Sequence, residues 1–225
     1  QATGQAIFVD DIPTPAGCLF GALVKSTIPK GKVVSIHTAK ALQLEGVIAF
    51  YDYNDVPNKS HSPPEKEHAF CQGFVSYIGD VIGVVIAETQ VLADRASNMI
   101  VVEYEEASTD SAEAPCFDID TAIEKKSFMK YGKEVVDGDV DAIFKEAGDD
   151  IIILEGIQRE GGQEHFYMEP HALLVVPGEN QDIEILSMTQ CVTKTQSTVA
   201  ETLGIPASKV NVKVKRIGDS ALGLG

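Results

Sequence analysis

The densest run of residues that could do chemistry is the decapeptide GGQEHFYMEP, residues 161–170. Its two adjacent glycines would allow the backbone to approach another group closely. Polar side chains then occupy most of the following positions, namely Gln163, Glu164, His165, Tyr167 and Glu169. If these groups were buried, they would need hydrogen-bonding partners, as in a ligand site. An edge strand with a solvated polar face explains the same residues equally well, so the pattern alone leaves both interpretations open.

Histidine and cysteine are too scattered to form a metal centre through local spacing. The four cysteines include no CxxC pair; they are Cys18, Cys71, Cys116 and Cys191. Neither a structural zinc site nor an iron–sulfur cluster is expected from such spacing. The five histidines form no HxxxH or HExxH pattern. We therefore predict no metal ligand in this chain, and the residues by themselves identify no catalytic group.

Composition and charge are those of a globular protein with an acidic surface. The 225 residues are 44% hydrophobic and 23% charged, enough to build a substantial core. The net charge of −16 disfavours nucleic acid and anionic membranes as partners. No apolar run approaches the roughly 18 residues of a membrane helix, and no basic-then-apolar leader opens the sequence. We expect reduced cysteines and a cytoplasmic location.

The first 105 residues have the pattern of a mixed α/β domain. Strands are predicted at Ala6–Val9, Leu19–Ser26, Lys32–Ile36, Val47–Tyr51, Asp80–Ala87 and Ile100–Tyr104. Helices are predicted at Ala39–Leu44 and Gln90–Met99, each preceded by a threonine that could cap it. The strand at 80–87 is apolar at nearly every position, which predicts burial on both faces. Its succession with the second helix and the last strand suggests a right-handed crossover between parallel strands.

An acidic segment rich in small residues follows, over residues 106–150. We interpret it as a connector that runs over the surface, because such residues offer little to bury. Two short helices are predicted within it, at Ile119–Lys125 and Val140–Ala147. Asp139 is a plausible cap for the second of these helices.

Residues 151–225 return to a strand pattern. Strands are predicted at Ile151–Gly156, His171–Pro177, Ile183–Met188 and Val210–Val214, with a helix at Cys191–Leu203. The first three strands follow one another through turns, which predicts antiparallel pairing. Thr189 is the predicted cap of the helix.

Read together, these segments resemble the xanthine dehydrogenase / aldehyde oxidase family of molybdenum hydroxylases. TGQAIFVDDIPTP looks like the opening of the family's molybdenum-binding subunit, and VIGVVIAET with VVEYEE is similar to its hammerhead domain. GGQEHFYMEPHALLVVP and MTQCVTKTQSTVAETLGIP resemble the start of its molybdopterin-binding domain. The resemblance implies an α/β (α+β) fold: an α/β hammerhead domain over residues 1–105, the acidic connector over 106–150, and a partial molybdopterin-binding domain lobe over 151–225.

One site residue is implied by this resemblance. In the family, the glutamine that ends the TQ strand lies beside the molybdenum centre, and the matching residue here is Gln190. A neutral amide can hydrogen-bond the cofactor or a metal-bound oxygen without adding charge, and a helix start offers backbone N–H groups to an anion. Without the resemblance, Gln190 would be interpreted as an ordinary residue at a helix start. The resemblance thus implies Gln190 as a cofactor-binding residue.

The resemblance also implies an activity and partners. The family hydroxylates purines, other N-heterocycles or aldehydes with oxygen taken from water. Molybdopterin-bound molybdenum accepts the electrons, which pass to iron–sulfur clusters and FAD on other domains. The implied partners are a small-molecule substrate, purine or aldehyde, and a second copy in a homodimer, with neither nucleic acid nor membrane.

The sequence departs from the family pattern in its last residues. The family has a glycine-rich loop with a phenylalanine beside the metal, followed by a Lys-Glu pair that contacts substrate. Here Gly218 and Gly223 match, Ala221 stands at the phenylalanine position, and the family's catalytic glutamate has no counterpart. We therefore expect a fragment or short relative of a molybdenum hydroxylase that is not catalytically competent alone. The alternative is a non-catalytic stand-alone domain that keeps the fold for binding or assembly.

Overall fold

The computed structural model describes residues 2–59, 68–106, 116–128, 135–146, 148, 151–162 and 171–217. The chain divides into two compact units. Residues 1–115 and 165–225 form the main unit, and residues 116–164 form the connector unit. Each unit is described by itself below.

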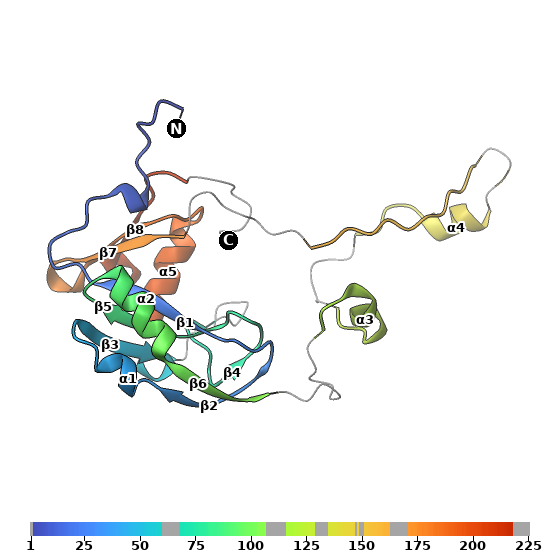
Figure 1. Ribbon diagram of the computed structural model, residues 1–225. Coiled ribbons are helices and arrows are strands. Elements are labelled where there is room, and N and C mark those ends of the chain that lie inside the picture. Colours follow the sequence, from blue (N-terminus) through green and yellow to red (C-terminus); the bar gives the residue numbers. More distant parts are fainter. Residues whose placement is uncertain are drawn as a thin grey trace. The chain divides into compact units, whose positions relative to one another are not determined.

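Strand β5 (Val81–Ala87) is the centre of the first sheet of the main unit, sheet A. It pairs antiparallel with β1 (Phe20–Lys25) on one side and with β3 (Val47–Asp52) on the other (Figure 1). Glycine is required at position 83, because a Cβ there would lie 2.5 Å from the Tyr51 carbonyl oxygen of β3. Most positions of β5 are buried, as its unbroken apolar sequence predicts.

Helix α2 (Gln90–Met99) packs on β1 and β5 and has the predicted bounds. The Thr89 hydroxyl accepts the N–H of Leu92 at 3.2 Å, so the predicted threonine cap is confirmed. The cap predicted for the short helix α1 (Ala39–Leu42) is wrong, because Thr38 makes no side-chain capping hydrogen bond there. Residues 6–8, predicted to start a strand, instead precede the single turn η1 (Val9–Asp11).

The second sheet, sheet B, has the order β4-β2-β6 and is antiparallel throughout. Its strands are β2 (Gly31–His37), β6 (Val101–Glu106) and the short β4 (Phe74–Val75), which the sequence did not predict. The predicted parallel crossover is wrong, since β5 and β6 belong to different sheets. In β6, half-buried Val102 and Tyr104 alternate with exposed residues. That pattern suits an antiparallel strand with one solvated face, whereas a strand within a parallel sheet is buried on both faces.

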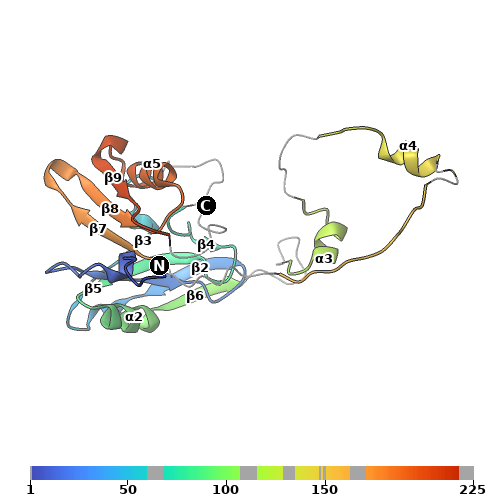
Figure 2. The same ribbon diagram turned by 90° about the horizontal axis from the view of Figure 1, so that it is seen from above.

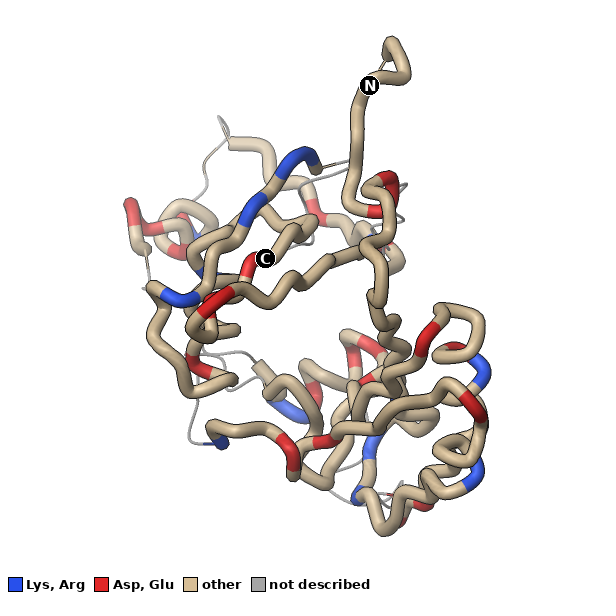
Figure 3. Tube along the Cα trace, turned by 90° about the vertical axis from the view of Figure 1, so that its left-hand side faces the viewer, with Lys and Arg blue, Asp and Glu red and all other residues tan. Residues whose placement is uncertain are grey.

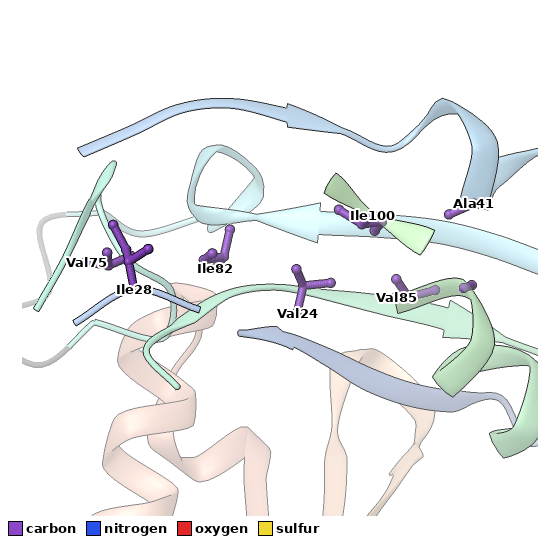
Figure 4. Close-up of a cluster of buried hydrophobic side chains, with 8 residues drawn as sticks. Val24, Ile28, Ala41, Val75, Ile82, Val85 and Ile100 are labelled. Carbon is purple, nitrogen blue, oxygen red and sulfur yellow. The ribbon is translucent and has the colours of Figure 1, made fainter. Parts of the chain in front are cut away.

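The main hydrophobic core lies between sheets A and B (Figure 4). Its buried residues are Val24, Ile28, Ala41, Val75, Ile82, Val85, Ala96 and Ile100. They come from both sheets and from the two helices, so residues distant in the sequence form one cluster. Residues of β2 and β6, including Val33, Val102 and Tyr104, pack against this core from the side of sheet B.

Sheet C is formed by β7 (Leu173–Pro177), β8 (Ile183–Ser187) and β9 (Val210–Lys213). The predicted antiparallel pairing of β7 with β8 is confirmed, and β9 joins β8 in parallel through α5 (Val192–Leu203). Figure 2 shows α5 beside this sheet. Single turns occur at η3 (Glu179–Gln181) and η4 (Ala207–Lys209). The α5 contact with β9 is reinforced by Gln196, whose amide donates to the Val210 carbonyl at 2.7 Å.

Residues on either side of the connector unit in sequence are joined within the main unit. The turn η2 (Tyr53–Asp55) leads to Asn58, which reaches the C-terminal end of α5. The Asn58 backbone N–H donates to the Thr202 carbonyl at 3.2 Å, and its side-chain amide donates to the Glu201 carbonyl at 2.8 Å. These bonds satisfy carbonyl groups that a helix end leaves without helical partners.

The connector unit contains two short helices, α3 (Ile119–Glu124) and α4 (Val140–Lys145), close to the predicted ranges. Asp118 accepts the N–H of Thr121 at 2.8 Å, and Asp139 accepts that of Ala142 at 2.9 Å, so the predicted Asp139 cap is confirmed. The strand predicted at 151–156 is wrong, because these residues pair with no strand among those described. Extended apolar residues do not make a strand unless another strand supplies their backbone partners.

Figure 3 marks Asp and Glu residues at many places along the Cα trace. Among the described residues, no helix is long and apolar enough to cross a membrane.

Candidate functional site

Gln190 lies between the end of β8 and the start of α5. Just before it, buried Met188 donates its backbone N–H to the Ala172 carbonyl at 3.3 Å, which holds the chain as it leaves sheet C. Gln190 then follows at an exposed bend. Its side-chain amide makes no hydrogen bond within the described part of the chain. The amide is therefore accessible to a ligand.

The start of α5 has no side-chain cap. Its N-cap residue is Cys191, which makes no capping hydrogen bond. The predicted capping role of Thr189 is wrong: its hydroxyl accepts the N–H of Cys191 itself at 3.2 Å. A cap must reach the second or third residue of the helix, and Thr189 stands too early in the chain to do so. An uncapped helix start favours a negatively charged group nearby.

Two basic residues belong to the same edge of sheet C as Gln190. Strands β8 and β9 run parallel, with Leu186 opposite Lys213, so their carboxyl ends share one edge. Gln190 follows β8 there, while exposed Lys215 and Arg216 follow β9. The carboxyl ends of parallel strands are the usual ligand-binding edge of an open α/β sheet. A neutral amide, an uncapped helix start and two cations together suit a small anionic group.

Much of the sequence that suggested chemistry lies outside the described residues. This holds for residues 163–170 of the polar decapeptide, and for residues 218–225 with Gly218, Ala221 and Gly223. Gly161 and Gly162 are described, and a Cβ built on either would meet open space. The close backbone approach predicted at these glycines is therefore not made by any described residue.

The cysteines and acidic residues make no metal centre in the described part of the chain. All four cysteines are free thiols. Burial raises the pKa of the Cys71 thiol, which disfavours the thiolate that metal binding requires. Across residues 2–59, 68–106 and the later described ranges, no three His, Cys, Asp or Glu side chains converge as metal ligands.

Sequence reasoning missed a polar cluster on sheet B. The Ser35 hydroxyl donates to Glu103 Oε2 at 2.7 Å, and His37 Nε2 lies 3.1 Å from Glu103 Oε1. The hydrogen bond from Ser35, followed by the one from His37, lowers the pKa of Glu103. Because the Ser35 proton is directed to the carboxylate, the cluster is not arranged to make a nucleophile of the serine. Ser35 and His37 are two residues apart, which predicts that their side chains share one face of a strand. Their contact with Glu103 depends on the register of β2 with β6.

A depression of about 520 Å³ lies beside the same strand. It is lined by Val33, Val34, Ser35, Ile36, Asp52, Tyr53, Asn54, Cys71, Gln72, Gly73 and Ile82. Its walls come from β2, the end of β3, η2 and the segment before β4, with Ile82 of β5 contributing to the lining. None of the residues predicted to bind a ligand lies in it, so we do not assign it to the candidate site.

Comparison with known protein families matches nearly the whole chain in two parts. Residues 3–108 match the a/b hammerhead domain of aldehyde oxidase and xanthine dehydrogenase. Residues 123–220 match a molybdopterin cofactor-binding domain, and this range contains Gln190. Sheets A and B therefore form a hammerhead domain, and sheet C with α5 belongs to a cofactor-binding domain.

Individual relatives agree with both matches. Over 97% of its length the chain is 39% identical to the xanthine dehydrogenase of Blastobotrys adeninivorans and 39% identical to the xanthine dehydrogenase/oxidase of Gallus gallus. The aldehyde oxidoreductase from Desulfovibrio gigas has a similar fold, with a TM-score of 0.77 at 21% identity over 97% of this chain and 26% of that one. The chain belongs to the xanthine dehydrogenase / aldehyde oxidase family of molybdenum hydroxylases. It spans only 15% and 16% of the length of the two relatives.

Proposed function

We propose that this chain supplies the hammerhead domain and the first lobe of the molybdopterin-binding domain of a molybdenum hydroxylase, with Gln190 contacting the cofactor. In this proposal residues 1–105 are the hammerhead domain, 106–150 the connector and 151–225 the lobe. The observation that carries the proposal is the place of Gln190. It is an exposed amide at the carboxyl edge of sheet C, beside the uncapped start of α5.

The residues at this edge fit an anionic cofactor. The amide of Gln190 can donate or accept a hydrogen bond at no cost in net charge. The α5 start and the cations Lys215 and Arg216 favour the negative charge of a phosphate-bearing pterin. When bound, the cofactor would supply the molybdenum that takes up electrons from the substrate. The role of this chain would be to hold and orient it.

The substrate class we propose is the one named for the relatives, purines or aldehydes, with oxygen taken from water. FAD and iron–sulfur clusters would lie on other parts of the complete enzyme, because the spacing of the four cysteines here does not suit a cluster. We assign no catalytic residue to this chain. General-base help is typically worth about 10²–10⁴-fold, and among the described residues we identify no candidate base beside Gln190.

A chimera tests the role of Gln190. The matched segment of the Gallus gallus relative is replaced by this chain, and molybdenum content and xanthine oxidation are measured. We expect Gln190→Ala to lower the rate about 10–100-fold, the usual cost of losing a group that supports a metal centre. Gln43→Ala is the matched control, since this glutamine is exposed at the end of α1 in the hammerhead domain. Equal activity of the Gln190 variant and the control would refute the role of Gln190.

The chain by itself gives a second test. We expect the 225-residue protein, made in a host that synthesises the cofactor, to contain little molybdenum and to reduce no dye with xanthine or an aldehyde. A closed site with many donors is needed to hold such a cofactor, and one lobe offers an open edge. Near-stoichiometric molybdenum with dye reduction would contradict this expectation.

The alternative is a non-catalytic domain that keeps the fold for binding or assembly. Ala221 favours it, because the family has a phenylalanine at this position of the glycine-rich loop. An Ala221→Phe variant of the chimera separates the two proposals. If the catalytic role holds, the variant should retain or gain activity. If both the chimera and its Ala221→Phe variant lack molybdenum, the alternative is favoured.

A further inference from the structure

The C-terminal end of α5, away from Gln190, is held by a residue of the hammerhead domain. A helix leaves its last four carbonyl groups without partners inside the helix. The Glu201 carbonyl accepts the side-chain amide of Asn58 at 2.8 Å, and the Thr202 carbonyl accepts the Asn58 backbone N–H at 3.2 Å. Asn58 lies 143 residues before Glu201 and within the range matched to the hammerhead domain. One domain therefore caps a helix of the other.

The turn that follows α5 completes the same helix end. Gly204 has a φ of 67°, the left-handed conformation in which many helices terminate. The Ile205 N–H then reaches back to the Ala200 carbonyl at 2.9 Å. Among the described residues, the backbone donor to the Thr202 carbonyl is Asn58. The hammerhead domain thus supplies a donor that the turn itself does not provide.

Asn58 is itself tied closely to sheet A. It lies three residues after η2, which follows β3 directly in the chain. Two reciprocal hydrogen bonds fix this turn. The Asp52 carboxylate accepts the Asn54 N–H at 2.7 Å, and the Asp55 carboxylate accepts the Asp52 N–H at 2.9 Å. A short, hydrogen-bonded path therefore connects β3 with the end of α5.

The two ends of α5 are packed differently. Near the C-terminal end, buried Ala200 packs with Ile185 and Val210 of sheet C. At the other end, residues 192–194 are exposed and lie next to Gln190 in the chain. Twelve residues of helix are about 18 Å long, so a tilt of about 5° at the packed end moves the start by roughly 1.5 Å. The end that Asn58 holds is therefore the end that sets the direction of the helix.

We propose that Asn58 is a positioning residue, which fixes the direction of α5 against the hammerhead domain and thereby places Gln190. A hydrogen-bond donor suits this end of a helix, because the carbonyl groups there carry partial negative charge. The accuracy matters for catalysis, since a misplacement of about 1 Å can lower a rate about a hundredfold. The inference rests on the proposed contact of Gln190 with the cofactor, but the direction of α5 can be measured without any cofactor.

The orientation of α5 relative to sheet A in the 225-residue chain is the first test, measured by residual dipolar couplings of backbone amides. Asn58→Asp keeps the side-chain shape but replaces the donor with a carboxylate, which the helix carbonyls repel. We expect it to alter the orientation more than Asn58→Ala does. Asn98→Asp is the matched control, because the Asn98 amide donates to the Asp94 carbonyl at 2.8 Å within α2. The parental orientation in Asn58→Asp would overturn the inference, since only the shape of the side chain would then matter.

The chimera with the Gallus gallus relative provides the second test. We expect Asn58→Asp to lower kcat for xanthine about tenfold, as for other residues that orient a metal centre, while Asn98→Asp keeps the parental kcat. An effect of Gln190→Ala without one of Asn58→Asp would overturn this inference and leave the proposed function standing. No effect of Gln190→Ala would refute the proposed function. The orientation of α5 in the chain alone would still decide whether Asn58 fixes the helix.

Discussion

Strand β5 and residues 151–157 have similar sequences and opposite surroundings. β5 reads VIGVVIA and is paired on both sides, with Ile82 1% and Val85 0% exposed. The other segment reads IIILEGI, lies in no described sheet, and leaves Leu154 90% exposed. A run of β-branched and apolar residues thus favours burial of the segment. Whether it becomes a strand depends on neighbours that satisfy its backbone groups.

The comparison also separates what stabilises each part. In the main unit, side chains from two sheets and two helices meet in one core. In the connector unit, no described residue is buried, and the contacts there are local ones such as the Asp118 and Asp139 caps and the Arg159–Asp120 pair. Exposed caps and ion pairs each contribute little to stability, because water and salt screen them. We therefore expect stability to be concentrated in the main unit.

A charge placed in the core should have the largest effect on stability. We expect Val85→Asp to lower the free energy of unfolding by about 4 kcal/mol or more, because its carboxylate would be buried without a partner. Urea denaturation followed by circular dichroism measures the change. The control Val91→Asp, at a residue of α2 that is 79% exposed, should stay within about 0.5 kcal/mol of the parent. Similar midpoints for the two variants would break the contrast between buried and exposed apolar residues.

A methyl group between β5 and β3 should have the next largest effect. Gly83→Ala puts a Cβ 2.5 Å from the Tyr51 carbonyl oxygen and from the Phe50 ring, so the strands must separate. We expect a loss of about 1–3 kcal/mol, as for other overpacked sites. Gly21→Ala on β1 is the control, since its nearest neighbour, a methyl carbon of Val84, is 3.4 Å away. A loss at position 21 as large as that at position 83 would contradict this packing argument.

The Ser35–His37–Glu103 cluster should add a smaller, pH-dependent effect. Its hydrogen bonds lower the pKa of Glu103 from its ordinary value of 4.5 in the folded protein. A group with a depressed folded pKa stabilises the fold fully above the ordinary value, and this contribution is lost as pH falls through the lower folded value. Unfolding midpoints of the parent and Glu103→Gln should therefore differ at pH 6 and converge in strong acid. A constant difference across that range would show that the carboxylate is not responsible.

Substitution within residues 151–157 should have the smallest effect on the stability of the chain. Leu154→Asp should change the free energy of unfolding by less than about 0.5 kcal/mol, since the leucine is already in water. A destabilisation of several kcal/mol would show that Leu154 is already covered within the chain.

Local patterns in the sequence determined most of the elements. The Thr89 cap and the apolar spacing of residues 90–99 are sufficient to define α2, because both act within a few residues. The uninterrupted apolar run of β5 indicated burial on both faces for the same reason. Gln190 was identified through the family resemblance of the MTQ segment. Its residue type and spacing alone would have made it an ordinary residue at a helix start.

Only the tertiary structure decided which elements pair. The sequence suggested that β5 and β6 lie side by side, but they belong to sheets A and B, and residues 151–156 join no described strand. The Ser35–His37–Glu103 cluster and the shared edge of Gln190 with Lys215 and Arg216 likewise depend on register between separate strands. The apolar residues of a strand indicate how much of its surface must be buried. Which partner covers it depends on the free energy of the whole assembled core, and no single segment contains that information.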